Sequence, residues 1–285
     1  MKTAFLSFAV FSFFSLHAQY YYNDIIGTQE TNHQMQTYLA NKVKMVSATG
    51  YTAQGSKATD FAEIQEIKEN GRTLRISSNA EMNSTILYKH FDEQARLISI
   101  TDSSSGAGSI TTYMYDMAGR ITKIENKVKD TSSEIDQTET HIWIWSNDGK
   151  PVTMWRIING SDSLEIRFIP DEKGNPGEER SFRRGYETDY LYYYFDDKTR
   201  ITDIVRYNKK VKRLLPDVII SYDDSDRAIQ KIISAPADNY GRVTWIGYNI
   251  WRYVFNEKGL KTKEALYNND RELTGKIEYS YTFGQ

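Results

Sequence analysis

The stretch TYMYDMAGRITKIEN, residues 112–126, decides how this chain folds. Tyr113 and Tyr115 are two residues apart, so their rings lie on the same face of a strand. Asp116 can accept hydrogen bonds from the backbone just after it and so open a turn. Gly119 tolerates the left-handed conformation that closes such a turn, and the apolar residues that follow begin a returning strand. The stretch therefore predicts a β-hairpin.

The same pattern returns from residue 85 to the end of the chain. In most copies an anchor residue, usually aromatic, precedes Asp, Ser or Asn, and Gly or a substitute comes three residues after that; the copy around Ile169 is degraded and has one extra residue before Gly174. Successive anchors are 24 to 33 residues apart. A period of this length is typical of repeat proteins, in which neighbouring units complete each other's core. We expect about seven hairpins and a final half copy, with anchors at Phe91, Tyr115, Trp145, Ile169, Phe195, Tyr222, Phe255 and Tyr281.

A stripe of aromatic residues precedes the anchors. The position two residues before the anchor is aromatic in five of the eight copies, whereas aromatic residues make up 13% of the chain. Because positions i and i+2 share a strand face, this stripe predicts a buried layer. Its members are Tyr113, Trp143, Tyr193, Tyr253 and Tyr279.

Some copies lack the turn glycine and carry Ala95, Thr199 or Asp226 instead. A residue with a Cβ atom in the left-handed region costs about 1 kcal/mol or more. The β-branched Thr199 fits worst, so we expect a different or a strained turn there. On the return strand, Ile121 and Ile124 are three residues apart, which requires either a bulge or packing on both faces.

The pattern resembles the YD repeat of the RHS family, which reads roughly Tyr-x-Tyr-Asp-x-x-Gly-Arg-Leu. The residues that carry the resemblance best are Tyr113, Tyr115, Asp116, Gly119, Arg120 and Ile121. In that family the repeats form a long antiparallel sheet that spirals into a shell around a toxic C-terminal domain. About seven units are too few for such a shell, so encapsulation and autoproteolysis are not implied. The resemblance implies the hairpin fold, and a secreted protein of the Bacteroidetes type.

The first 19 residues, MKTAFLSFAVFSFFSLHAQ, indicate export. Lys2 precedes an apolar run that is too short to span a bilayer, which needs roughly 20 apolar residues. A charged start, a short apolar run and a small residue at the cut are typical of a secretory signal peptide. We expect residues 1–18 to be removed near Ala18, and the mature chain to be secreted, periplasmic or on the cell surface. A buried N-terminal helix is the alternative.

Residues 19–84 precede the repeats and differ from them. Apolar residues at steps of three and four predict a helix over residues 28–44, and Thr31 followed by Gln34 fits a capping box at its start. Asn70 and Gly71 separate two alternating runs, which predicts a hairpin with positive φ at both residues. We expect residues 19–84 and the repeat region, residues 85–285, to form one continuous structural unit.

Composition excludes several kinds of site. The chain has no cysteine, so it can form neither disulfides nor thiolate metal sites. Its net charge of −2 gives no reason to expect a nucleic-acid partner. The histidines His33, His90 and His141 show no metal-ligand spacing, and on strands such residues are most often hydrogen-bonded or solvated. We expect no cofactor, no metal and no catalytic residue.

Three aromatic residues are the candidates for binding. Trp245, Tyr248 and Trp251 lie in the longest interval between anchors, where a repeat does not account for them. Exposed rings there would suit stacking on a glycan. Two further features have simpler explanations. The acid-rich turns at Asp196 and Asp223 suit turn formation better than calcium, and the basic segments 179–185 and 208–213 suit solvated loops.

The sequence predicts an all-β fold of tandem hairpins in a curved or spiral sheet, with one short N-terminal helix. Its function is predicted to be that of an exported, non-enzymatic binding or structural module of the cell envelope, with a polysaccharide or an envelope protein as partner. A glycan-active enzyme with carboxylates on a concave face is the alternative. An outer-membrane β-barrel is less favoured, because Lys123, Glu125, Asp203 and Lys231 interrupt any apolar lipid face.

Overall fold

The computed structural model describes residues 20–80, 83–103, 107–130, 135–208, 212–235 and 247–284. The predicted signal peptide and Trp245 lie outside these residues. No helix in the described part of the chain combines the length and the apolar character needed to cross a membrane.

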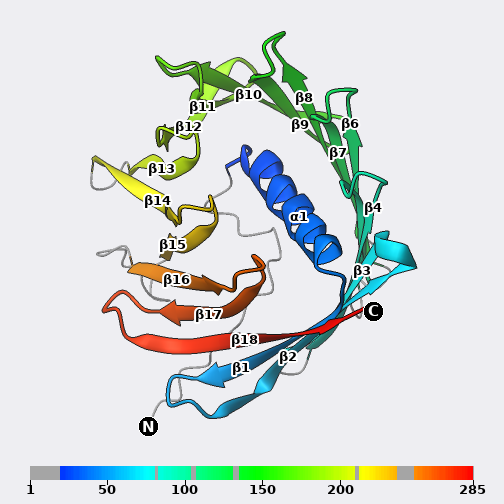
Figure 1. Cartoon of the computed structure of the whole chain (residues 1–285). Helices are drawn as coiled ribbons and strands as arrows, with labels where there is room; N and C mark the ends of the chain where they lie inside the picture. Colours follow the sequence, from blue (N-terminus) through cyan, green and yellow to red (C-terminus); the bar gives the residue numbers. More distant parts are fainter. Residues whose placement is uncertain are drawn as a thin grey trace. The chain divides into compact units, whose positions relative to one another are not determined.

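The described chain contains one α-helix, one 3₁₀ turn and eighteen strands (Figure 1). The helix is α1 (Asn23–Ala40), and the 3₁₀ turn is η1 (Glu69–Gly71). The strands are β1 (Val43–Thr52), β2 (Lys57–Lys68), β3 (Thr73–Ala80), β4 (Asn83–Phe91), β5 (Leu97–Asp102), β6 (Ala107–Tyr115), β7 (Ile121–Asp130), β8 (Ile135–Trp145), β9 (Pro151–Ile158), β10 (Asp162–Pro170), β11 (Pro176–Arg183), β12 (Tyr186–Phe195), β13 (Ile201–Asn208), β14 (Arg213–Tyr222), β15 (Ala228–Ala235), β16 (Gly247–Phe255), β17 (Lys261–Tyr267) and β18 (Leu273–Phe283).

The strands form one antiparallel sheet whose order closes on itself. Along β3–β11 and β13–β18, consecutive strands pair with one another, and β1 pairs with both β2 and β18. A sheet whose first and last strands are hydrogen-bonded has no free edge, which is the strand order of a closed barrel. The prediction of an open curved or spiral sheet is therefore wrong. The all-β class, the hairpins and the single helix are confirmed; β1, which is not a repeat, provides the closing strand.

The return strands contain the bulge that the sequence left open. In the hairpin of β6 and β7, Met114 pairs with Lys123 but Tyr115 pairs with Ile121, so Thr122 is an extra residue. The Thr122 hydroxyl donates to the Met114 carbonyl at 3.2 Å. The extra residue places both Ile121 and Ile124 on the buried face. Thr202, Thr262 and Thr274 make the equivalent hydrogen bond in later hairpins.

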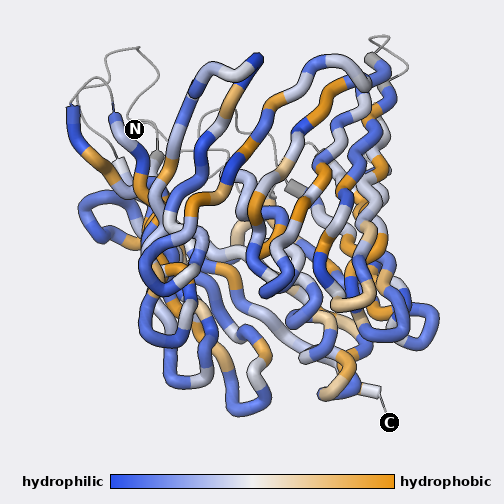
Figure 2. Tube along the Cα trace, turned by 90° about the horizontal axis from the view of Figure 1, so that it is seen from above, coloured by the Kyte–Doolittle hydropathy of each residue, from blue (hydrophilic) through white to orange (hydrophobic). Residues whose placement is uncertain are grey.

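The chain divides into two compact units. The described residues of one are Ser47–Ala62 and Tyr192–Ser280; those of the other, called the helix unit here, are Tyr20–Val46, Glu63–Leu191 and the last residues from Tyr281. The first has a small cluster of Ala48, Phe61 and Ile277 with Tyr279 packed against it. The core of the helix unit joins Tyr21 and Ile25 to β7–β10. Apolar and polar residues alternate along the strands, as Figure 2 shows.

The helix differs from its predicted bounds at both ends. It begins five residues before residue 28 and ends at Ala40, and Val43 and Val46 are buried in β1 instead of on a helix face. Thr31 and Gln34 lie inside the helix and do not cap it. The residue before the helix, Tyr22, makes no side-chain cap of its own. The Glu179 carboxylate of β11 instead accepts the N–H groups of Tyr21 and Tyr22, just before the helix, and no local sequence pattern could indicate it.

The turn at Asn70 and Gly71 connects β2 to β3, as predicted, with φ of 53° and 88°. It is longer than two residues because η1 is inserted. A Cβ atom on Gly71 would lie 2.4 Å from a Leu39 methyl carbon, so the end of α1 packs directly on this turn.

Candidate functional site

The first candidate is the repeated turn, here called the aspartate turn, which the opening stretch represents. The Asp116 Oδ1 atom accepts the backbone N–H groups of Ala118 and Arg120, each at 2.9 Å. Its Oδ2 atom accepts Arg120 Nε at 2.7 Å. The backbone closes the turn through Gly119 N–H to the Asp116 carbonyl, with Gly119 at a φ of 78°. Hydrogen bonds from Arg120, first from its backbone, lower the pKa of Asp116.

The same turn recurs with the same hydrogen bonds. In each copy, the Oδ1 or Oγ atom of the residue that opens the turn accepts a hydrogen bond from the backbone N–H of the residue four positions later. These residues are Asp92, Ser146, Asp171, Asp196, Asp223, Asn256 and Asn268. The turn at Asn268 was not predicted, because no aromatic stripe or glycine accompanies it. Thr199 has a φ of 61° and adopts the same turn geometry as the glycine-containing copies. Of the two alternatives expected there, a different turn or a strained one, the strained turn is therefore correct.

Adjacent repeats contact one another through the arginine of this turn. Arg120 lies over the Trp145 ring, with its Cζ atom 5.6 Å from the ring centroid, and Trp145 Nε1 donates to the Ile121 carbonyl at 2.7 Å. Arg96 and Tyr115, Arg200 and Tyr222, and Arg227 and Phe255 stack in the same way. The hydroxyls of Tyr115 and Tyr222 also donate to the preceding return strand. These residues build the sheet, and their polar atoms are engaged in doing so.

The second candidate is a buried charged cluster in the helix unit. His141 of β8 lies between two carboxylates: Nδ1 is 2.6 Å from Asp24 Oδ2, and Nε2 is 3.0 Å from Glu139 Oε1. Arg156 of β9 binds the other Glu139 oxygen at 2.6 Å. Only 8% of His141 is exposed. We call Asp24, Glu139, His141 and Arg156 the histidine cluster.

The contacts within the cluster raise the pKa of His141 and lower that of Glu139. Burial by itself lowers the pKa of His141, but the charge of Asp24 and the hydrogen bonds of Asp24 and Glu139 outweigh burial and raise it to about 9. Burial favours a raised pKa for Glu139, but the hydrogen bonds of His141 and Arg156 lower it to about 2. At neutral pH His141 is therefore an imidazolium and Glu139 a carboxylate.

Aromatic side chains and the helix N-terminus surround the histidine cluster. Trp143 Nε1 donates to Asp24 Oδ2 at 3.1 Å, and the edge of the Tyr21 ring meets the His141 ring at a centroid distance of 5.6 Å. Glu179 of β11, only 3% exposed, accepts the backbone N–H groups of Tyr21 and Tyr22 at 3.0 to 3.1 Å. A carboxylate here suits the positive end of the helix dipole. The histidine cluster fastens the start of α1 to β8, and Glu179 adds a contact from β11.

General acid–base chemistry does not suit this arrangement. A general base needs a free lone pair near neutral pH, whereas both ring nitrogens of His141 face carboxylate oxygens. Glu139 is held by His141 and Arg156, and its lowered pKa makes it a weak base. The chemistry that the residues support is charge pairing between a helix and a sheet.

The predicted binding residues occupy β16 or lie outside the described chain. Tyr248 is opposite Ser234 of β15, and Trp251 is opposite Lys231. The register is continuous between them, so residues three apart point to opposite faces of the strand. The strand does not bring Tyr248 and Trp251 together on one face. Both are partly buried, and burial raises the pKa of Tyr248.

The basic segment 179–185 and the acid-rich turns contain ion pairs, whereas residues 209–211 of the basic segment 208–213 lie outside the described residues. Arg180 contacts Glu178 and Glu187, and Arg183 contacts Asp162. Asp226, in one of the acid-rich turns, contacts both Lys198 and Arg200. Within the ranges that the structure describes, no three His, Asp or Glu side chains are grouped as metal ligands. The other two histidines lie apart: His33 is exposed, and His90 contacts the Thr73 hydroxyl at 3.0 Å.

Sequence reasoning missed the histidine cluster and Glu179. The segment ETHIWIW, residues 139–145, does place Glu139, His141 and Trp143 on one strand face, which was the available signal. Nothing local links them to Asp24, which is 117 residues away from His141 in the chain.

No protein-family model matches the chain, so the resemblance to the YD repeat has no support from a family match. No curated protein matches it. Among solved structures, the chain is similar to TcdB2-TccC3-TEV, with 11% identity and a TM-score of 0.35 over 78% of this chain. It spans only 12% of the length of that chain.

The chain is also similar to porin-like proteins from two Bacteroides species. The protein from Bacteroides uniformis has 11% identity and a TM-score of 0.38, over 85% of this chain and 97% of the other. The protein from Bacteroides vulgatus has 11% identity and a TM-score of 0.32, over 84% and 98%. All three TM-scores lie below 0.5.

Proposed function

We propose that the chain is an exported, non-enzymatic module of the cell envelope that works in water and binds a polysaccharide or an envelope protein on its sheet face or loops. The observation that carries the proposal is the charge on the face of β7–β11 that points away from α1. Since Ile124 and His141 pair on the helix-facing side, the neighbouring residues point outward.

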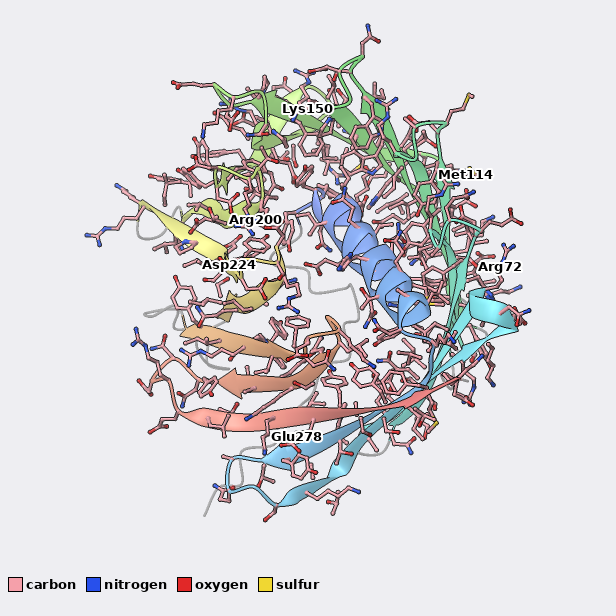
Figure 3. All side chains as sticks on the ribbon, viewed as in Figure 1. Arg72, Met114, Lys150, Arg200, Asp224 and Glu278 are labelled. Atoms are coloured by element: carbon pink, nitrogen blue, oxygen red, sulfur yellow. The ribbon has the colours of Figure 1, made fainter. Side chains whose placement is uncertain are left out.

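The outward residues of β7 form an ion-paired row. Lys123 and Lys127 contact the two oxygens of Glu125 at 2.7 and 2.8 Å. Met114 of β6, opposite Lys123, also points away from α1 (Figure 3) and is 52% exposed. A single Lys or Arg at the lipid midplane of a membrane barrel costs about 2–4 kcal/mol. A row of such residues favours contact with water.

The outward rows of β10 and β11 continue this pattern. Arg167 contacts Glu165 at 2.8 Å, and Arg180 contacts Glu178 at 2.6 Å. Apolar residues such as Ile142 and Ile144 occur between the charged rows, and each is 39% to 46% exposed. A mixed surface of this kind suits a partner that offers both hydrogen bonds and apolar contact, as glycans and proteins do.

Fractionation of expressing cells tests the location. We expect the chain, cut near Ala18 as judged by intact mass, to be in the periplasm or medium, or to leave membranes in urea or alkaline carbonate. Extraction by detergent alone would contradict the proposal and favour an outer-membrane β-barrel.

A thermal-shift screen of residues 19–285 with bacterial and dietary polysaccharides tests the binding. A ligand that prefers the folded chain raises the melting temperature. We expect Trp251→Ala or Tyr248→Ala to reduce the shift, and Tyr194→Ala, at a 49% exposed ring, to leave it unchanged. No shift with any glycan would remove glycans as the ligand, and release of new reducing ends would contradict the non-enzymatic role.

A further inference from the structure

Polar contacts fasten α1 to the strands along its whole length. Asp24, in its first turn, contacts His141 and Trp143. In the middle, the Asn32 side-chain oxygen accepts the Leu97 N–H at 2.8 Å. In the last turn, the Tyr38 hydroxyl donates to Gln65 at 3.1 Å. Of these contacts, the one at His141 depends on a proton that the protein can lose.

The geometry at His141 requires a protonated ring. Each ring nitrogen lies within hydrogen-bond distance of a carboxylate oxygen, and an ionised carboxylate can only accept. Both nitrogens must therefore donate, and only the imidazolium has two N–H groups. A neutral ring would turn a lone pair toward either Asp24 or Glu139.

We propose that the protonated His141 ring is a releasable lock, which holds the first turns of α1 on β8 and frees them when the proton is lost. Loss of the proton would replace one of the two hydrogen bonds of the His141 ring with repulsion between a nitrogen lone pair and a carboxylate. It would also remove the positive charge that faces Asp24 from the sheet.

The other charged groups around the ring act in the same direction. Asp24 approaches the ring from α1 and Glu139 from β8, Glu179 of β11 binds the Tyr21 N–H beside them, and Arg156 of β9 is the cation paired with Glu139. Two tyrosines also face the cluster, and both stay neutral: burial raises the pKa of Tyr21 to about 12 and also raises that of Tyr113. Loss of the His141 proton therefore increases an existing excess of negative charge.

The pKa values set the range over which the lock holds. His141 titrates at about 9 when folded, above its ordinary 6.5, so its stabilisation is complete below pH 6.5 and is lost as the pH rises through 9. Glu139 titrates at about 2 instead of 4.5, so its contribution is complete above pH 4.5 and is lost as the pH falls toward 2. The lock is strongest in mildly acidic solution and opens in alkaline solution.

Release of the start of α1 would expose buried aromatic side chains of β8 and β10. Trp143 is 3% exposed, and its ring stacks on Phe168 at a centroid distance of 5.3 Å. Tyr21 and Ile25, from the helix end that the lock holds, belong to the same buried cluster. The intrinsic fluorescence of Trp143 should therefore change as the helix end leaves.

The test is an NMR titration of the mature chain with ¹⁵N-labelled histidine. At pH 7 we expect both His141 ring nitrogens to be protonated, with a midpoint near 9. Amide exchange over residues 25–28, corrected for its intrinsic pH dependence, should lose about tenfold or more of its protection between pH 7.5 and 9.5. The amide of Ile204 in β13 should not change.

Two variants distinguish the effect of His141 deprotonation from a general loss of stability at alkaline pH. His141→Gln cannot carry the charge, so its helix end should be poorly protected at pH 7 without a further step at pH 9. Glu139→Gln should move the His141 midpoint downward. A neutral His141 ring at pH 7, or helix protection that is unchanged through its titration, would overturn the proposal. If His141→Gln does not fold, the titration of the unaltered chain decides alone.

Discussion

The aspartate turns and the histidine cluster both place a carboxylate against a cation, but they do different work. Asp223 and Arg227 are four residues apart, and their side chains are 22% and 26% exposed. Asp24 and His141 are 117 residues apart, and the His141 side chain is 10% exposed. The turn pair shapes a local loop and repeats, whereas the histidine cluster has no second copy among the described residues and fixes a helix on a sheet. The recurring pair is visible in the sequence, whereas the pair that does not recur is not, and we expect the buried pair to contribute more to stability.

The largest effect is expected from Asp24→Ala. The change leaves the His141 imidazolium and the Trp143 N–H without their acceptor on the helix. Breaking a buried ion pair on one side costs about 3–5 kcal/mol. Urea unfolding measures this cost, with Gln29→Ala on the exposed face of the same helix as the control, expected within about 0.5 kcal/mol. An equal loss of unfolding free energy in the two variants would mean that Asp24 stabilises the fold no more than an exposed residue of the helix does.

The next effect concerns two adjacent glutamates on opposite faces of β11. Glu179→Gln removes the charge that accepts the N–H groups of Tyr21 and Tyr22, at a cost of about 1–3 kcal/mol. Glu178→Gln breaks only the more exposed pair with Arg180 and should cost about 0–1 kcal/mol. Thermal unfolding of both variants compares them. A larger loss of stability from Glu178→Gln would show that the exposed ion pair contributes more than the buried carboxylate.

A third test exchanges glycine and threonine at the positive-φ position of two aspartate turns. Gly119→Thr places a β-branched residue at a φ of 78° and should cost about 1–2 kcal/mol. Thr199→Gly relieves the φ of 61° and should gain up to about 1 kcal/mol, reduced by the entropy of a glycine in the unfolded chain. Chemical denaturation measures both. A stabilised Gly119→Thr variant would show that the turns do not share one geometry.

The smallest effect is expected from Arg227→Lys. Lysine loses the fork on Asp223 and the planar contact with the Phe255 ring, whose centroid is 5.0 Å away. The cost should be about 0.5–1 kcal/mol. The exposed Arg213→Lys is the matched control in the same thermal assay. A cost above that of Asp24→Ala would show that the repeat ladder, and not the cluster, dominates the stability.

The sequence predicts what is local in this fold. The alternation at Tyr113 and Tyr115, the hydrogen-bonding Asp116 and the glycine at 119 are enough to predict a hairpin, because all the partners lie within a few residues. The helix was also predicted, although its start was placed too late. The carboxylate that binds the backbone just before its start, Glu179, lies more than 150 residues away.

Closure and the histidine cluster could not be predicted for the same reason. Nothing in the pattern of β1 or β18 says that they pair, because a strand's alternation defines its faces and not its neighbours. Of the residues around His141, only Glu139 is near in the sequence; Asp24 of α1 and Arg156 of β9 are brought to it by the fold. The proposed binding residues Tyr248 and Trp251 remain a prediction that the polysaccharide screen decides.

A pair of double-mutant cycles tests the central comparison most directly. One cycle combines Asp24→Asn with His141→Gln, and the other combines Asp223→Asn with Arg227→Gln, with the free energy of unfolding measured at pH 6. We predict a coupling of about 2 kcal/mol or more for Asp24 and His141, and less than about 1 kcal/mol for Asp223 and Arg227. Couplings of equal size, or a larger one at the turn, would contradict the account.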